Sequence, residues 1–309
     1  MTQYLYEVSL EVSRKFLFTA HAGAVYALEK AAAPGIVFSG SSDKFVAAWN
    51  LVSGEQEKFA AQFPAPVYSL LYSAEQKILL AGTGAGSIHF LDLEKKEEIK
   101  VLQLHQAQVF DLALSQKYSL LFSAGGDGQL AVCAASNFSF LRAIKLCKEK
   151  IRGLALSPDE EMLAVACGDG SIRIFSLPEM KELKMFHAHS LSANCLAWHP
   201  NGKWLLSGGR DAYLRAWDIA SGYSLISAVP AHNFALYRIV FSPDGKLFAT
   251  ASRDKTVKLW EAETLKFLLR INKENHEGHV NSVNTLLWED AGLVSAGDDR
   301  AIMVWEIAG

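Results

Sequence analysis

The sequence predicts an all-β fold assembled from seven copies of one structural unit. Three observations support this prediction. An aspartate recurs about every 42 residues, a tryptophan or another apolar residue follows most of these positions by six residues, and turn residues divide every interval into short apolar segments. Repeats of this kind are typical of arrays in which each unit buries its apolar face against its neighbours.

The period is regular along the chain, with successive intervals of 42, 42, 42, 42, 43 and 45 residues. The aspartate position is occupied by Asp43, Ala85, Asp127, Asp169, Asp211, Asp254 and Asp299. The position six residues further on is occupied by Trp49, Leu91, Cys133, Phe175, Trp217, Trp260 and Trp305. A period maintained over seven copies indicates one continuous array.

Each copy has the punctuation of four short strands. The sixth copy, residues 231–271, contains an apolar segment, a Pro-Asp-Gly turn, a second apolar segment, a polar turn, the tryptophan segment and a last apolar segment. Short strands bounded by Gly, Pro, Asp and Ser are typical of all-β proteins. The inner segments are almost continuously apolar, which indicates burial on both faces, as expected for four-stranded sheets stacked around an axis.

A histidine lies 28 residues before the tryptophan position in four copies and 26 residues before it in the last copy. These residues are His21, His105, His189, His232 and His279. With the pairs Gly278-His279 and Trp217-Asp218, the chain resembles the WD40-repeat family. The resemblance implies a seven-bladed β-propeller with four antiparallel strands in each blade, forming a single domain over residues 1–309.

The resemblance also implies how the ring closes. Residues 11–18 precede His21 as a last strand precedes each later histidine, whereas only four residues follow Trp305. In the family, the N-terminal strand completes the last blade and leaves no open seam. We therefore expect residues of about 11–18 to form the fourth strand of the seventh blade.

A hydroxyl residue lies four positions before most of the aspartates and completes a recurring set of side chains. The complete sets are His21, Ser39, Asp43 and Trp49; His189, Ser207, Asp211 and Trp217; His232, Thr250, Asp254 and Trp260; and His279, Ser295, Asp299 and Trp305. Copy three has His105, Ser123 and Asp127 without the tryptophan, and copies two and four have Phe63 and Cys147 at the histidine position. The resemblance implies a hydrogen-bonded tetrad, which would satisfy a buried aspartate.

Serine, histidine and aspartate are also the residues of a nucleophilic triad, which is the alternative, enzymatic interpretation. A catalyst needs one solvent-reachable site, whereas this set occurs five times, which favours a structural role. The spacings of His187 with His189 and of His276 with His279 suit a metal, but the second histidine of each pair already belongs to a tetrad set. We predict no catalytic residues, no metal and no cofactor.

A candidate binding site lies five residues after the histidine position, early on the innermost strand and near the mouth of the central channel implied by the resemblance. The residues there are Tyr26, Tyr68, Phe110, Arg152, Asn194, Tyr237 and Asn284. Aromatic residues and arginine are enriched in binding hot spots, and tyrosine faces also suit a cationic or methylated side chain. The alternative is that the aromatic residues pack between blades and that Arg152 pairs with Asp111.

The residue before the aspartate varies as an exposed turn would, and it is arginine in two consecutive copies. Arg210 and Arg253 would add positive charge to the rim that carries the histidine loops and aspartate turns, here called the upper rim. A negatively charged peptide would suit that edge, although a solvated pair of arginines is the alternative. The polar segment at residues 272–277 is a local insertion expected on the same rim.

Bulk properties exclude several classes of protein. The net charge of −3 argues against a nucleic-acid binder, no apolar run has the length of a membrane span, and the four cysteines have no paired spacing. We therefore expect no nucleic-acid or membrane partner, and a reducing, cytoplasmic location.

We interpret the sequence as a non-enzymatic scaffold that binds a protein or peptide partner on the upper rim and channel mouth, as a monomeric propeller or as a subunit of a complex. Two alternatives remain open. The first is a propeller enzyme or small-ligand sensor that uses the central channel. The second is an architectural subunit, which extensive apolar outer surfaces would favour.

Overall fold

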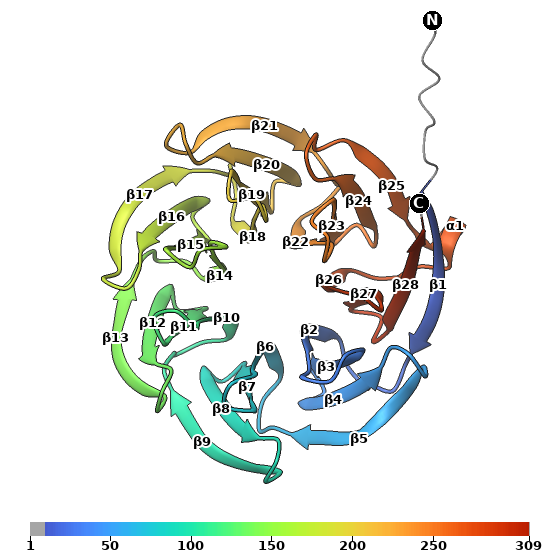
Figure 1. Cartoon of the computed structure of the whole chain (residues 1–309), viewed down its shortest axis with the longest axis horizontal. Coiled ribbons are helices and arrows are strands. Elements are labelled where there is room, and N and C mark those ends of the chain that lie inside the picture. The colour runs from blue at the N-terminus through green and yellow to red at the C-terminus, as the bar shows by residue number, and fades with distance from the viewer. Residues whose placement is uncertain (1–9, 309) are drawn as a thin grey trace, which may run out of the picture.

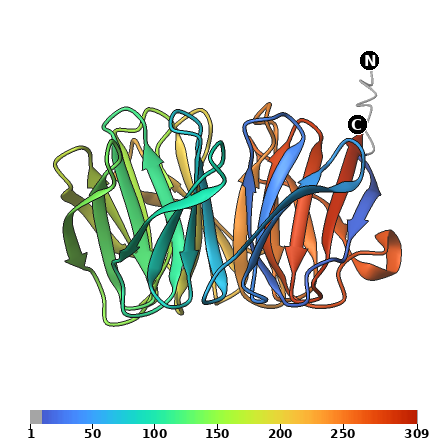
Figure 2. The same ribbon diagram turned by 90° about the horizontal axis from the view of Figure 1, so that it is seen from below.

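The computed structural model describes residues 10–308, which form seven four-stranded antiparallel sheets arranged as blades around a central channel (Figure 1). This architecture confirms the all-β, seven-bladed fold predicted from the period. Residues 1–9 and 309 of the expected domain lie outside the described residues. Seen from the side, the strands of each blade run between two faces from which the connecting loops project (Figure 2).

Each blade has an innermost, a second, a third and an outer strand. The innermost strands are β2 (Val25–Lys30), β6 (Val67–Ser73), β10 (Val109–Ser115), β14 (Ile151–Leu156), β18 (Ala193–Trp198), β22 (Leu236–Phe241) and β26 (Val283–Glu289). The second strands are β3 (Ile36–Ser41), β7 (Ile78–Thr83), β11 (Leu120–Gly125), β15 (Met162–Cys167), β19 (Trp204–Gly209), β23 (Leu247–Ser252) and β27 (Gly292–Gly297). Blades are numbered one to seven in this order.

The third strands are β4 (Phe45–Asn50), β8 (Ser87–Asp92), β12 (Gln129–Ala134), β16 (Ser171–Ser176), β20 (Tyr213–Asp218), β24 (Val257–Glu261) and β28 (Ile302–Ala308). The outer strands are β5 (Glu55–Gln62), β9 (Glu97–Gln103), β13 (Ser139–Lys145), β17 (Lys181–His187), β21 (Ser224–Pro230), β25 (Phe267–Ile271) and, in blade seven, β1 (Glu11–Phe18). Burial falls from the second and third strands, which are almost entirely buried, to the outer strands, where most side chains are exposed.

The ring closes between the two ends of the chain, as the sequence predicts. Strand β1 pairs antiparallel with β28 from the Glu11–Ala308 pair to the Phe18–Ile302 pair, and the innermost strands β2 and β26 lie side by side. Blade seven is therefore assembled from residues at both ends of the described chain. Figure 1 shows β1 beside β28 at the outer edge of blade seven, next to blade one.

The core lies between neighbouring blades. Apolar residues of blade one, including Val25, Val37 and Trp49, pack in one cluster with Val294 and Val304 of blade seven. The same arrangement recurs around the ring, so each sheet is covered on both faces. Fully burying a large apolar side chain contributes about 1.5–3 kcal/mol, which explains why the inner segments lack the apolar–polar alternation of a half-exposed strand.

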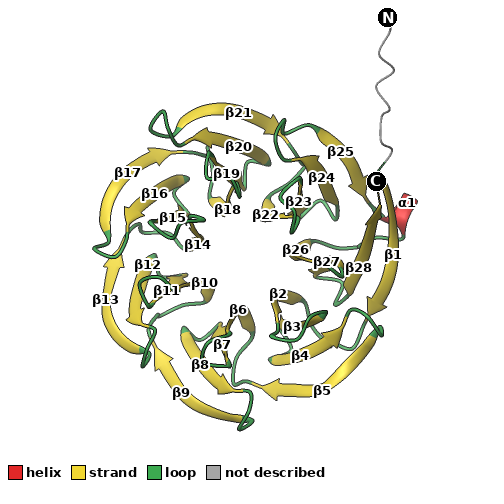
Figure 3. Cartoon of the chain, viewed as in Figure 1, coloured by secondary structure: helices red, strands yellow, loops and turns green. Residues whose placement is uncertain are grey.

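The insertion at residues 272–277 contains a single-turn helix, α1 (Lys273–His276). The side chain of Asn272 caps its N-terminus by accepting from the backbone N–H of Asn275. The helix lies at the outer edge of the ring beside β1, where Arg14 donates to Glu277 (Figure 3). Within residues 10–308, no helix reaches the length or hydropathy that a bilayer crossing requires.

Candidate binding site at the channel mouth

A β-bulge occurs at the same place in all seven innermost strands. The pairing register with the second strand shifts there by one residue, for example between Val25 and Ala27 in blade one. A bulge leaves one residue outside the ladder and redirects its side chain. The extra residues are Tyr26, Tyr68, Phe110, Arg152, Asn194, Tyr237 and Asn284. These seven mouth residues are the positions that the sequence singled out as a candidate binding site.

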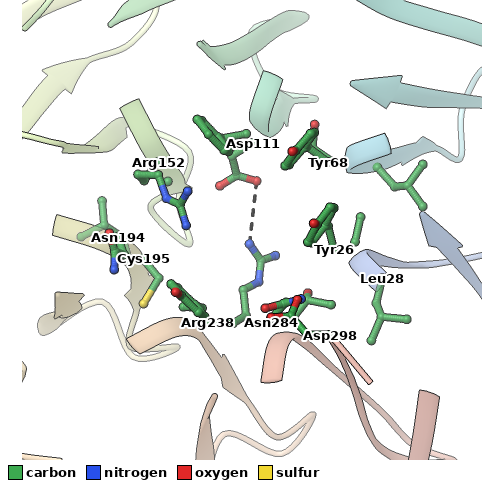
Figure 4. Close-up of a pocket in the computed structure, with 18 residues that line it drawn as sticks. Tyr26, Leu28, Tyr68, Asp111, Arg152, Asn194, Cys195, Arg238, Asn284 and Asp298 are labelled. Carbon is green, nitrogen blue, oxygen red and sulfur yellow. Dashed lines mark hydrogen bonds and ion pairs between the residues drawn. The ribbon is translucent and has the colours of Figure 1, made fainter. Parts of the chain in front are cut away.

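All seven mouth residues line one cavity of about 300 Å³ at the centre of the ring (Figure 4). The cavity is also lined by the polar residues Ser69, Asp111, Arg238, Thr285 and Asp298. Its volume is at the lower end of the range for ligand pockets. It is therefore large enough for one or two side chains of a partner.

Aromatic residues form the side of the cavity contributed by blades one to three. The rings of Tyr26 and Tyr68 stack almost in parallel, with 4.7 Å between centroids and an angle of 7°. Phe110 meets Tyr68 edge to face at 5.6 Å. Because the two tyrosine faces are turned toward one another, the facing surfaces are not free to receive a cation between them.

Arg152 belongs to blade four, next to Phe110 of blade three, and lies against aromatic rings. Its guanidinium carbon is 4.5 Å from the ring centroid of Phe110 and 5.7 Å from that of Tyr237. No ion pair or hydrogen bond of the Arg152 side chain occurs within residues 10–308. The suggested pairing of Arg152 with Asp111 is therefore wrong, because the carboxylate of Asp111 is engaged elsewhere.

Asp111 accepts the backbone N–H of Leu154 in the next blade at 2.8 Å and faces Arg238 at 3.8 Å. Figure 4 shows Arg238 extending across the channel from blade six toward this carboxylate. Burial raises the pKa of Asp111, and the nearby Arg238 opposes this shift only in part. The Nε atom of Arg238 is buried without a hydrogen-bond partner among the described residues.

The two asparagines of the ring have partners in neighbouring strands. Asn194 donates to the carbonyl of Leu236 at 2.9 Å, and Asn284 donates to the carbonyl of Val25 at 3.1 Å and to Asp298 at 2.8 Å. Each asparagine thus links its innermost strand to the next blade. They form part of the cavity wall; Asn284 uses both of its amide N–H groups in these bonds, and Asn194 uses one.

Arg210 and Arg253 are exposed on the upper rim and are not among the residues that line the cavity. Arg253 lies over the ring of Phe234 at 5.9 Å. Lys150, on the loop before β14, lies over Phe110 at 5.8 Å. Burial lowers the pKa of Lys150, and the positive charges of Arg152 and Arg210 lower it further. The cations of blades four and five are therefore close enough to repel one another.

The histidine sets form continuous hydrogen-bond chains behind the upper rim. In all five, histidine Nδ1 lies 2.8–3.1 Å from the aspartate and Nε2 lies 2.7–2.9 Å from the hydroxyl oxygen. In the four complete sets the tryptophan N–H donates to the same hydroxyl at 2.7–3.0 Å. The aspartates also accept a loop N–H, for example from Ala22.

Burial and charge distinguish these chains from a catalytic triad. The hydroxyl residues Ser39, Ser207 and Ser295 are completely buried, so no substrate can approach the oxygen that would have to attack it. Burial lowers the pKa of His189 and His232, which favours the neutral imidazole. Burial opposes ionisation of Asp211, but bonds from His189 and Arg215 outweigh it and hold the pKa of that carboxyl well below its usual range.

Comparison with known proteins agrees with this geometry. The family description "WD domain, G-beta repeat" matches residues 96–132, 139–176, 180–218, 223–261 and 271–306, which together make up more than half of the chain. The chain belongs to the WD40 repeat family. No match to a curated protein was found.

The WD40 repeat matches begin at residue 96, but the blade architecture extends over the whole described chain. Blade two, whose first three strands precede the matches, contains a polar chain that the sequence analysis missed. Thr83 and Ser87 are joined at 2.7 Å, Ser87 bonds His89 at 2.9 Å, and His89 bonds Glu98 at 2.6 Å. The sequence assigns no tetrad to this copy, which has Phe63 at the histidine position. The Ser87–Ile88–His89 alternation, which places both polar residues on one face of a strand, was the available signal.

Blade four differs from the other WD40 blades in having sulfur at the histidine position. Cys147 donates to the carbonyl of Glu149 at 3.0 Å, and its sulfur groups with the carboxylates of Glu149 and Asp169 within 4.8 Å. Within residues 10–308 this is the group of three potential metal ligands that the geometry brings together, and neither His187 nor His276 belongs to it.

Proposed function

We propose that this WD40 propeller is a non-enzymatic scaffold that binds a protein or peptide partner at its upper rim and channel mouth. WD40 propellers commonly serve in protein–protein interaction. The observation that carries the proposal for this chain is the set of seven bulges that turn seven side chains toward one cavity, among them Arg152 on its aromatic neighbours. Rigid rings with such sites on their loops and strand ends are well suited to partner binding.

A cytoplasmic location belongs to the same proposal. The cysteines Cys133, Cys147, Cys167 and Cys195 are all free and buried. Free thiols are typical of proteins that work in a reducing compartment.

Partner capture tests this proposal. Wild-type protein and a Tyr26/Tyr68/Tyr237→Ala variant would be used as baits in lysate of the native host, with melting curves to establish that both baits are folded. A Phe140/Leu183/Leu225→Ser variant, altered on the outer strands β13, β17 and β21, serves as the matched control. We expect the mouth variant to lose partners that the control retains. Equal capture by the wild type and the mouth variant would overturn the proposal.

An architectural subunit is a second candidate, because the outer strands expose apolar side chains. These residues are Ile99, Val101, Phe140, Leu141, Leu183, Met185, Leu225, Ile226, Phe267 and Leu268. Exposed apolar patches often mark interfaces between proteins. If partners were lost by the outer-strand variant and retained by the mouth variant, the outer surface would be the interface.

A further inference from the structure

We infer that the blade four to blade six side of the cavity binds a carboxylate supplied by an acidic segment of the partner. This inference rests on the proposed function and specifies the chemistry of the partner. Three observations support it. Four cations lie close together, and the described residues offer too few carboxylates to pair with them. The tyrosine faces that could otherwise bind a cation are stacked on one another.

Four cations lie on this side, which we call the cationic side: Lys150, Arg152, Arg210 and Arg238. Arg152 and Arg238 line the cavity itself. Lys150 and Arg152 share the ring of Phe110, and Lys150 is destabilised by repulsion from Arg152 and Arg210. A cluster of like charges in a partly buried place is costly, and a bound anion relieves both the repulsion and the lost hydration.

The described residues do not supply enough negative charge to satisfy this cluster. Arg238 faces Asp111 and also acts on the carboxylate of Glu29. Asp111 accepts the backbone N–H of Leu154 as well. Glu149 is adjacent to Lys150 in sequence, but its carboxylate groups with Cys147 and Asp169. Asp298 lies on the opposite wall and accepts from Asn284. Arg152 is therefore left with aromatic rings rather than an anion.

The geometry suits a carboxylate better than a cation. A guanidinium presents N–H groups in a planar fork that matches the two oxygens of a carboxylate. The contacts of Arg152 with the rings of Phe110 and Tyr237 restrict its side chain, which lowers the entropy lost on binding. The tyrosine surface that would receive a cation is used in the Tyr26–Tyr68 stack.

Peptide selection followed by charge removal tests the inference. A displayed library of random peptides would be selected on the wild-type protein, and the tightest peptide synthesised in three forms: unchanged, with its Asp or Glu replaced by Asn or Gln, and with its C-terminal carboxylate amidated. Affinities would be measured by calorimetry for the wild type, Arg152→Met, Arg152→Lys and Arg270→Met. Arg270 is exposed on β25, so its variant controls for the loss of one positive charge.

We expect that neutralising one carboxylate weakens binding to the wild type and to Arg270→Met at least tenfold, but weakens binding to Arg152→Met less than twofold. Arg152→Lys retains the charge without the planar fork, so neutralising the carboxylate should weaken binding to this variant by an intermediate factor. This variant also keeps the test valid if Arg152→Met is not stably folded. The two modified peptides distinguish a side-chain carboxylate from a C-terminal one, and either result supports the inference.

Two other outcomes have different meanings. If peptides bind at the mouth, as judged by loss on Tyr68→Ala, but neutralisation costs the same on the wild type and on Arg152→Met, the inference is overturned and the proposed function stands. If no peptide is selected, or if every mouth variant binds as well as the wild type, the proposed function fails and the inference fails with it.

Discussion

Asp111 of blade three and Arg238 of blade six face one another across the central channel, with 3.8 Å between a carboxylate oxygen and a guanidinium nitrogen. The two side chains differ in their surroundings, because 42% of the Arg238 side chain is exposed but only 14% of Asp111 is. Asp111 also accepts the N–H of Leu154 from blade four, whereas the Arg238 side chain makes no hydrogen bond among the described residues. Asp111 therefore holds the innermost strand of blade four as well as Arg238, whereas Arg238 contributes charge without a hydrogen bond.

This asymmetry predicts unequal costs of mutation. Arg238→Met removes a long, partly exposed ion pair and should lower the free energy of unfolding by less than about 1 kcal/mol. Asp111→Ala also leaves the buried N–H of Leu154 without an acceptor and should cost about 1–3 kcal/mol. Denaturant titration measures both values. A larger loss for Arg238→Met would show that the ion pair, not the link between blades, is the important contact.

The tetrad geometry predicts that removing the Asp211 carboxylate of blade five lowers the free energy of unfolding much more than removing that of Asp169, its counterpart in blade four. Asp211 accepts from His189 and Arg215 at 2.9 and 2.8 Å, so Asp211→Ala should cost on the order of 2–4 kcal/mol. Within residues 10–308, Asp169 accepts only from Ser171 and has no histidine partner, so Asp169→Ala should cost less than about 1 kcal/mol. The measurement is equilibrium unfolding of both variants. A loss below about 0.5 kcal/mol for Asp211→Ala would contradict the structural role proposed for the tetrad.

Glu29 on β2 predicts a dependence of stability on pH. Burial raises the pKa of Glu29 from 4.5 to about 7, although Arg238 and the backbone of Tyr72 oppose the shift. Between these two values the folded protein holds a proton that the unfolded chain has released. The contribution of Glu29 to stability is therefore greatest below pH 4.5, falls as the pH rises, and stays low above about pH 7.

The Glu29→Gln variant lacks this titration and should unfold less readily than the wild type at pH 8. The difference should be about 1–3 kcal/mol, since one pKa unit corresponds to about 1.4 kcal/mol and the side chain retains some contact with solvent. At pH 5 the difference should be much smaller. Melting curves of both proteins at the two pH values measure it, and a difference that does not change with pH would show that Glu29 titrates normally.

Closure of the ring by β1 predicts a strong effect of N-terminal deletion. Removing residues 1–18 exposes the edge of β28 and the cluster in which Phe18 packs on Trp49 at 5.0 Å. We expect the melting temperature to fall by about 10 °C or more, because a paired strand and a buried aromatic side chain are lost together. Removing residues 1–9 leaves β1 whole and is the matched control. Equal melting temperatures for the two deletions would mean that β1 does not hold the ring closed.

The repeat, the number of blades and the closing strand could all be predicted from the sequence. The repeat and the number of blades depend on contacts that recur at short, fixed separations. His189, Ser207 and Asp211, for example, lie within about one blade of each other, so the same spacing returns wherever the same hydrogen bonds are made. The closing strand pairs residues from opposite ends of the described chain, and it was predictable because residues 11–18 precede His21 as a last strand precedes each later histidine. The mouth residues could also be selected by counting five residues from each histidine position, because the repeat places the same strand position in every blade.

Only the tertiary structure decided what those positions do. The direction of each mouth side chain follows from a bulge that has no residue signature of its own, since the extra residue is tyrosine in blade one and asparagine in blade five. The pairing of Asp111 with Arg238, rather than with the neighbouring Arg152, joins blades that meet only across the channel. Contacts within a blade are local and repeat with the sequence, whereas contacts across the channel depend on the radius and closure of the whole ring.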